Sequence, residues 1–121
     1  MVEPLNFQQE GDYFWITLSK PNIDLVSGSQ ASALCEQLEQ QGIKRLVIDL
    51  SHLPYFGSSL IEFFITLWRL VGQSEGRLII FKPSPVGKEV LAAARLTQLW
   101  PIAESREDAI RLVRQNRPTA Q

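Results

Sequence analysis

The sequence predicts a single-domain α/β fold in which a mixed β-sheet of about five strands packs with about four α-helices, in the order β-β-α-β-α-β-α-β-α. The 121 residues suit one domain with one hydrophobic core. Two near-continuous apolar runs, 45–50 and 77–81, are typical of strands buried on both faces of a parallel sheet. Each run precedes a segment with helical signals, and this alternation indicates parallel strands joined by helices.

The chain begins with two β-prone runs, 5–9 and 13–18, separated by the letters EGD. This pattern predicts an antiparallel hairpin at the start of the sheet. Ser27 or Ser29 can cap the first helix, and Gly42 is its expected stop.

The remainder of the chain alternates between strand and helix. The expected elements are a strand at 45–50, a helix from the serines at 58 and 59 to about 71, a strand at 77–81, a helix to about 94, a short strand within 99–103 and a helix ending at 113. Ser84 is the expected N-cap of the third helix, with Pro85 in its first position. Ser105, or less well Glu104, caps the last helix. The domain is expected to span 1–114, with 115–121 as a flexible tail.

Charge and composition exclude several functions. A net charge of -1 with scattered Lys and Arg gives no electrostatic footprint for nucleic acid or an anionic membrane. Cys35 is the single cysteine, which excludes an intramolecular disulfide and a cysteine metal cage. No metal or cofactor site is expected, because one histidine and scattered carboxylates lack ligand spacing. The N-terminus lacks the signal-peptide pattern and the apolar segment 60–71 is too short to span a bilayer, so a cytoplasmic location is the default expectation.

The central helix carries one polar stripe on an otherwise apolar surface. At about 100° per residue, five polar positions share one face: Ser58, Glu62, Thr66, Arg69 and Gln73. The other positions from 60 to 71 are apolar, an arc wider than the roughly 100° stripe that a one-sided helix buries. Phe63, Phe64 and Trp68 are expected to be core residues first, with a partner-binding face as the alternative.

The start of this helix is the strongest candidate site. Ser59 and Glu62 match the capping box, in which both side chains bind backbone N–H groups of the first turn. Ser58 can instead be the N-cap, with Ser59 in the first helical position. Capping alone is the simpler interpretation. The functional interpretation adds that a phosphoryl group on Ser58 would lie at the positive end of the helix dipole. It would also place about two negative charges on a surface that a partner must cover.

Enzymatic interpretations of the same residues are weak. His52 is the single histidine, but a serine hydrolase with the G-x-S-x-G elbow would need glycine where Ile61 stands. Gly87 and Lys88 resemble the end of a phosphate-binding P-loop, but the rest of that motif does not match. No catalytic residue is therefore expected.

Three segments together match a known family pattern: the strand VIDLSHL, the helix start FGSSLIEFF and the stretch GRLIIFKPSPVGKEVLAAARLTQLWPIAESREDAI. With these segments the chain resembles the STAS domain, the fold of anti-sigma factor antagonists in bacteria. The segments correspond to the family's strand ending in Asp-Leu-Ser, its hydroxyl-bearing helix start, and its later strand, Asn-Pro-Ser-Pro-like loop and C-terminal helix. The resemblance covers about 5–113 and has the element order predicted above.

By position, Ser58 corresponds to the family's phosphorylatable serine and Ser59 to the serine or threonine after it. Gly57 stands where the family usually has aspartate, and Leu60 stands where it usually has glycine. The missing carboxylate removes a capping and partner-contact group, and Leu60 adds bulk where a close backbone approach is usual. Docking without phosphorylation therefore stays open beside the usual switch.

The resemblance implies a non-enzymatic regulatory module that binds a serine-kinase anti-sigma factor or a related switch protein. Phosphorylation is expected at Ser58, with Ser59 less favoured. The implied partner-binding residues are Tyr55, Phe56, Gly57, Ser58, Ser59 and Leu60. The alternative is an unphosphorylated accessory or scaffold subunit of a transporter or lipid-trafficking complex. In both cases the expected partner is a protein. The chain itself is expected to bind no cofactor and no nucleic acid, not to insert into a membrane, and to be a monomer or weak homodimer.

Overall fold

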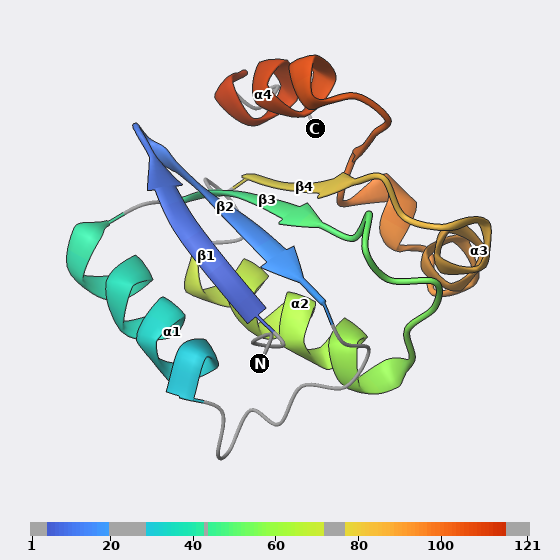
Figure 1. The fold of residues 1–121 in the computed structure, drawn as a ribbon, viewed down its shortest axis with the longest axis horizontal. Helices are drawn as coiled ribbons and strands as arrows, with labels where there is room; N and C mark the ends of the chain where they lie inside the picture. Colours follow the sequence, from blue (N-terminus) through green and yellow to red (C-terminus); the bar gives the residue numbers. More distant parts are fainter. Residues whose placement is uncertain (1–4, 20–28, 43, 72–76, 116–121) are drawn as a thin grey trace.

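The computed structural model describes residues 5–19, 29–42, 44–71 and 77–115. They form the predicted α/β fold with the predicted order of strands and helices (Figure 1). The structure adds one short 3-10 helix between the third α-helix and the last strand. The elements are β1 (Leu5–Glu10), β2 (Tyr13–Leu18), α1 (Ser29–Gln41), β3 (Arg45–Asp49), α2 (Ser58–Leu70), β4 (Arg77–Phe81), α3 (Pro85–Ala93), η1 (Leu96–Gln98), β5 (Ile102–Ala103) and α4 (Arg106–Arg114). The predicted cap Ser27 and the predicted tail beyond Gln115 lie outside the described residues.

The five strands form one mixed sheet in the order β1-β2-β3-β4-β5. β1 and β2 pair antiparallel as the predicted hairpin, with Glu10 opposite Tyr13 across a two-residue turn. Gly11 in that turn has a φ of 69°, a left-handed conformation that glycine adopts without steric cost. β2, β3, β4 and β5 pair in parallel, as the strand–helix alternation predicts.

One face of the sheet is covered by α1 and α2 (Figure 1). The predicted core residues Phe63 and Phe64 are fully buried there, and Trp68 packs partly buried against the same core. Phe64 and Trp68 each meet the ring of Trp100 edge-on, with centroids 6.1 and 6.0 Å apart. The wide apolar arc of α2 is therefore used mainly inside the domain, the simpler of the two interpretations.

The opposite face of the sheet is covered by α4 over β3, β4 and β5 (Figure 1). Ala109 and Val113 of α4 are fully buried against this face. Two arginines at the starts of neighbouring strands hold the end of the helix. Arg45 donates to the Val113 carbonyl at 2.6 Å, and Arg77 donates to the Leu112 carbonyl at 2.9 Å. Cations at a helix C-terminus satisfy the last carbonyls and complement the dipole.

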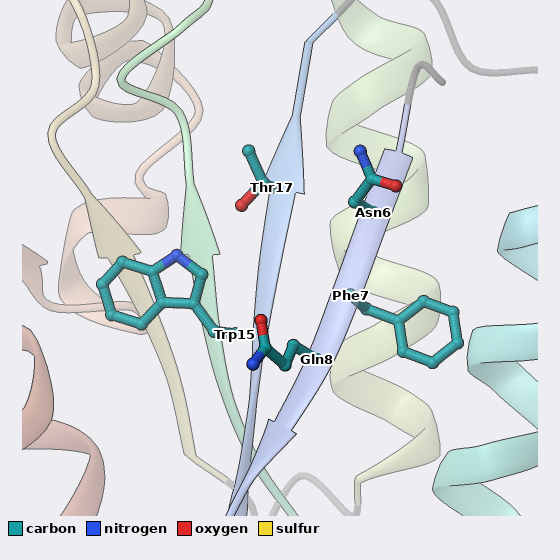
Figure 2. A pocket seen from close by; sticks show the side chains of 5 residues that line it. All are labelled: Asn6, Phe7, Gln8, Trp15 and Thr17. Carbon is teal, nitrogen blue, oxygen red and sulfur yellow. The ribbon is translucent and has the colours of Figure 1, made fainter. Parts of the chain in front are cut away.

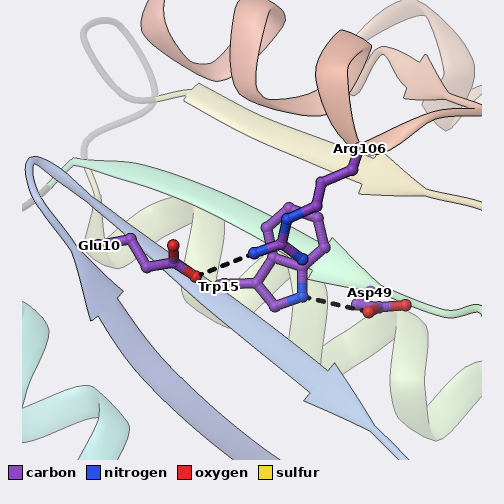
Figure 3. Close-up of polar contacts among 4 residues, drawn as sticks. All are labelled: Glu10, Trp15, Asp49 and Arg106. Atoms are coloured by element: carbon purple, nitrogen blue, oxygen red, sulfur yellow. Dashed lines mark hydrogen bonds and ion pairs between the residues drawn. The ribbon is translucent and has the colours of Figure 1, made fainter.

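A polar cluster links this face to the end of β3 (Figure 3). The Trp15 indole N–H donates to Asp49 Oδ2 at 3.1 Å, and both residues are buried. The Arg106 guanidinium lies 4.2 Å from the centre of the Trp15 ring and forms an ion pair with Glu10 at 3.3 Å. The arginine thus covers the indole with its planar cation, a favourable geometry for cation–π attraction.

Both predicted serine caps of the later helices are confirmed. Ser84 is the N-cap of α3 and accepts from the Gly87 N–H, with Pro85 in the first helical position. Ser105 is the N-cap of α4 and accepts from the Asp108 N–H at 3.1 Å. The first helix ends at Gln41, and Gly42 follows in the left-handed conformation that a helix stop favours.

We predict that replacing Asp49 with alanine lowers the free energy of unfolding by about 2 kcal/mol, because the buried Trp15 N–H then lacks its acceptor. Urea denaturation of the wild type and variant measures this difference. In the double variant D49A/W15F the orphaned donor is gone, so the loss should be smaller than the sum of the single losses. Strictly additive losses would contradict the buried hydrogen bond.

Candidate functional site

The candidate site is the segment 51–57, which joins β3 to α2, together with the first turn of α2. β3 and β4 run parallel, so their carboxyl ends lie at the same edge of the sheet. The segment 82–84, which joins β4 to α3, therefore leaves the sheet beside the candidate loop (Figure 1). Contacts between these two segments decide the shape of the site.

The entry of the loop is fixed by Asp49. Its Oδ1 atom accepts from the Ser51 N–H at 2.9 Å and from the Ser51 hydroxyl at 2.6 Å. The Leu53 N–H donates to the Leu50 carbonyl at 3.1 Å, and the Leu53 side chain is buried. One buried carboxylate thus ties the loop to the end of β3 while its other oxygen binds Trp15 in β2.

The exit of the loop alternates between exposed and buried side chains. Pro54 and Tyr55 are exposed, Tyr55 by 57%, whereas Phe56 is only 4% exposed. The Phe56 ring meets Phe64 of α2 edge-on at 5.9 Å. It also lies against Gly87, where an added Cβ would be 2.8 Å from Phe56 Cε2. Glycine at position 87 therefore makes room for the ring that anchors the loop.

A hydrogen bond from α3 reaches the same loop. The Ser84 hydroxyl donates to the Pro54 carbonyl at 2.8 Å and accepts from the Gly87 N–H at 3.0 Å. A serine hydroxyl has one hydrogen to donate, and here that hydrogen goes to the loop. The start of α3 and the loop before α2 are consequently joined by one polar and one apolar contact.

The N-cap of α2 differs from both predictions. Gly57 is the N-cap, with φ -121° and ψ -161°, and it offers no side chain to the helix. The backbone of Ser58 and Ser59 therefore occupies the first two helical positions, and neither serine is at the N-cap position. Burial of Phe56 and Leu60 fixes where the chain enters the helix, and this packing outweighs the weaker preference of serine for the cap.

The predicted partner-binding residues fall into three groups. Tyr55 and Gly57 are exposed. Phe56 and Leu60 are buried, and Leu60 is fully so, which means that these two side chains shape the loop from inside. Ser58 and Ser59 are placed by their backbone at the start of α2, and their side chains lie outside the described part of the structure. Partner contact at this segment stays a prediction.

The predicted polar stripe of α2 lies on the surface. Glu62, Thr66 and Arg69 are exposed and, with Ile65, line an open depression of about 410 Å³. The Thr66 hydroxyl donates to the Glu62 carbonyl at 2.9 Å, so it is satisfied within the helix. Gln73, the predicted end of the stripe, lies outside the described residues.

Other candidate chemistry does not converge on the site. His52 is exposed, as expected for a solvated loop histidine. Burial, and secondarily the charge of Glu39, raise the pKa of the Cys35 thiol, which makes it a poorer nucleophile at neutral pH. Within the described ranges, no group of three His, Cys, Asp or Glu residues could hold a metal ion. None of the helices in those ranges is long and apolar enough to cross a membrane.

A small hollow lies away from the site, on the hairpin of β1 and β2 (Figure 2). Its lining residues are Asn6, Phe7, Gln8, Trp15 and Thr17, and Phe7 points away from Trp15 (Figure 2). The volume is about 70 Å³, far below the roughly 300 Å³ at which ligand pockets begin. The sequence did not predict this hollow, and its size indicates no ligand.

Comparison with known proteins decides the family. Residues 5–109 match the model of the STAS domain, which is most of the chain. The chain belongs to the STAS domain family. BtrV of Bordetella bronchiseptica, named as a candidate anti-sigma factor antagonist, is 30% identical over 94 residues, which cover 72% of this chain and 81% of BtrV.

Solved structures share the fold of this STAS domain. A candidate anti-sigma factor antagonist from Thermotoga maritima has a TM-score of 0.74 at 16% identity, covering 92% of this chain and 95% of its own. The Bacillus cell fate determinant SpoIIAA, in its phosphorylated form, has a TM-score of 0.68 at 22% identity, covering 91% of this chain and 99% of its own.

Sequence reasoning missed the residues that hold the loop of this STAS domain from the side of α3. Ser84 was predicted only as a helix cap, and Gly87 was considered only as part of a failed P-loop. A signal was present, since two loops that follow neighbouring parallel strands must meet at one edge of the sheet. The particular pairing of Ser84 with Pro54 joins positions 30 residues apart and is visible only in the fold.

We predict that replacing Gly57 with aspartate raises the free energy of unfolding by about 0.5 kcal/mol. An N-cap aspartate binds first-turn N–H groups and places a negative charge at the positive end of the dipole. The extended backbone at Gly57 accepts a side chain, and no atom lies within 4 Å of an added Cβ. Urea denaturation at pH 7 measures the gain.

The control for this cap is Gly57→Asn, which caps without a charge. Pairing with the dipole holds the aspartate pKa below its unfolded value of about 3.9, so the charge-dependent gain is present above that pH and is lost as pH falls through the folded pKa. The asparagine gain should not change over this range. A destabilised aspartate variant would contradict the assignment of Gly57 as the N-cap.

Proposed function

We propose that this STAS domain is a non-enzymatic regulatory module of the anti-sigma factor antagonist type, acting in the cytoplasm. Its partner would be a serine-kinase anti-sigma factor or a related switch protein, bound through the loop 55–57 and the start of α2. The observation that carries the proposal is that this segment exposes some residues to solvent while buried neighbours fix its backbone. Tyr55 and Gly57 are exposed, while buried Leu53, Phe56 and Leu60 hold the backbone between them in one shape.

Phosphorylation of Ser58 would regulate this binding. Ser58 is the first residue of α2, where backbone N–H groups and the helix dipole tolerate negative charge. The same phosphoryl group would oppose a partner by charge repulsion and by its desolvation cost. SpoIIAA, which shares the fold, has a phosphorylated form, and this likeness supports the assignment.

The two departures from the family pattern have different weights in this proposal. Leu60 is fully buried, so its side chain changes the core and removes nothing from the surface that a partner meets. Gly57 is exposed at the N-cap, so the missing carboxylate is a loss at that surface. Recognition by the partner would therefore depend more on Tyr55 and on the backbone of the helix start than on charge at position 57.

We predict that Ser58→Asp weakens binding of a serine-kinase anti-sigma factor, the partner proposed above, by at least about tenfold, or about 1.4 kcal/mol. Ser58→Ala should bind like the wild type, since it adds no charge. Isothermal titration calorimetry measures both affinities. Ser59→Asp is the matched control for a charge one residue further on, and it should weaken binding less.

Incubation with that kinase and ATP, followed by mass spectrometry, locates any phosphoryl group added. Phosphate on Ser58 supports the switch, and phosphate elsewhere contradicts it. Equal affinities of the S58D and S58A variants would also contradict it. Stable co-purification with a transporter or lipid-trafficking subunit, unaffected by either substitution, would favour the accessory-subunit alternative.

A further inference from the structure

We propose that Ser84 is a positioning residue of the Ser58 site, and that it sets the shape of the partner-binding loop through its hydrogen bond to Pro54. This role rests on the function proposed above, and it involves the N-terminus of α3 in that function. The Ser84 hydroxyl makes one hydrogen bond more than a helix cap requires. Capping uses only its acceptor capacity, toward the Gly87 N–H at 3.0 Å, whereas its hydrogen goes to the Pro54 carbonyl at 2.8 Å.

The chain contains a matched cap that lacks this second bond. Ser105 caps α4 with the same geometry, accepting from the N–H three residues on at 3.1 Å. Both serines satisfy one first-turn N–H of their helices. Of these two serines, Ser84 alone hydrogen-bonds to the loop before α2 within the described residues, so the loop contact is separate from capping.

A second contact lies directly beside the first. The Phe56 ring packs against Gly87, at the third position of α3, so closely that an added Cβ would be 2.8 Å from the ring. Ser84 and Gly87 therefore hold the loop at two residues, Pro54 by its carbonyl and Phe56 by its ring. Tyr55, which is 57% exposed, lies between the two held residues.

We call these two contacts, Ser84 with Pro54 and Gly87 with Phe56, the clamp. The clamp bears on the candidate site because the residues that it holds are close to Ser58 in the sequence. Pro54 precedes Ser58 by four residues, and Phe56 precedes it by two. A displacement of the clamp must be absorbed by Gly57 or passed on to the first turn of α2. A loop that is already held in its bound shape loses less conformational entropy when a partner binds. Loosening the clamp should thus weaken binding without altering any residue that the partner touches.

The test separates the two bonds of Ser84 by substitution. Ser84→Asp keeps a good capping acceptor but has no hydrogen for the Pro54 carbonyl when ionised. Ser84→Thr keeps both capacities. Ser105→Ala removes a matched cap and leaves the loop contact intact. Backbone amide order parameters from ¹⁵N relaxation report the mobility of residues 55–57 in each variant.

In S84D the order parameters of residues 55–57 should fall from about 0.85 to below about 0.6, while those within α3 stay near the wild-type values. S84T and S105A should keep the loop at the wild-type level. A loop that stays rigid in S84D, or one that loosens equally in S105A, overturns the proposal.

Binding of the serine-kinase anti-sigma factor used in the Ser58 test gives the second readout. The dissociation constant should rise about tenfold in S84D and stay unchanged in S84T and S105A. An unchanged dissociation constant in S84D with a loosened loop overturns the positioning role. If that protein does not bind the wild type at all, the proposed function fails for it, and the order parameters still decide the clamp independently.

Discussion

The parallel pairing of β3 with β4 is the constraint on which the rest of the site depends. Both strands are buried on both faces, and their register places Arg45 opposite Arg77 at one end and Asp49 opposite Phe81 at the other. At the first end the two arginines bind the last carbonyls of α4. At the second end the loops after the two strands leave the sheet level with one another. A one-residue slip would turn every buried side chain to the wrong face and separate these loops.

Much of the fold follows from local patterns that agree with one another. Apolar runs predicted β3 and β4, and serine before proline or before a charged turn predicted the starts of α3 and α4. The N-cap of α2 was predicted one or two residues too late, because several adjacent residues can cap a helix. Packing decided among them, since burying both Phe56 and Leu60 leaves the N-cap to Gly57. Such a preference depends on tertiary contacts, which no local pattern contains.

The contacts that hold the candidate loop could not be predicted from the sequence, because they too depend on tertiary structure. Ser84 as a helix cap is a local property, and it was predicted correctly. Its bond to Pro54 depends on the distance between two loops, and that distance is set by sheet register and by the position of α3. Gly87 likewise has no unusual backbone angle that would mark it; the need for glycine comes from the Phe56 ring beside it.

With glycine at position 57, a phosphoryl group on Ser58 would destabilise the domain little and would act mainly on the bound partner. An aspartate at the N-cap would compete for the first-turn N–H groups and would repel a phosphate on the next residue. With glycine there, the helix start accepts the added charge at lower cost to the domain itself. The free energy of the proposed switch would then come mainly from the partner, which would have to desolvate the charge or move away from it. A loop held by Ser84 and Gly87 suits such a mechanism, because the domain keeps its shape while its surface charge changes.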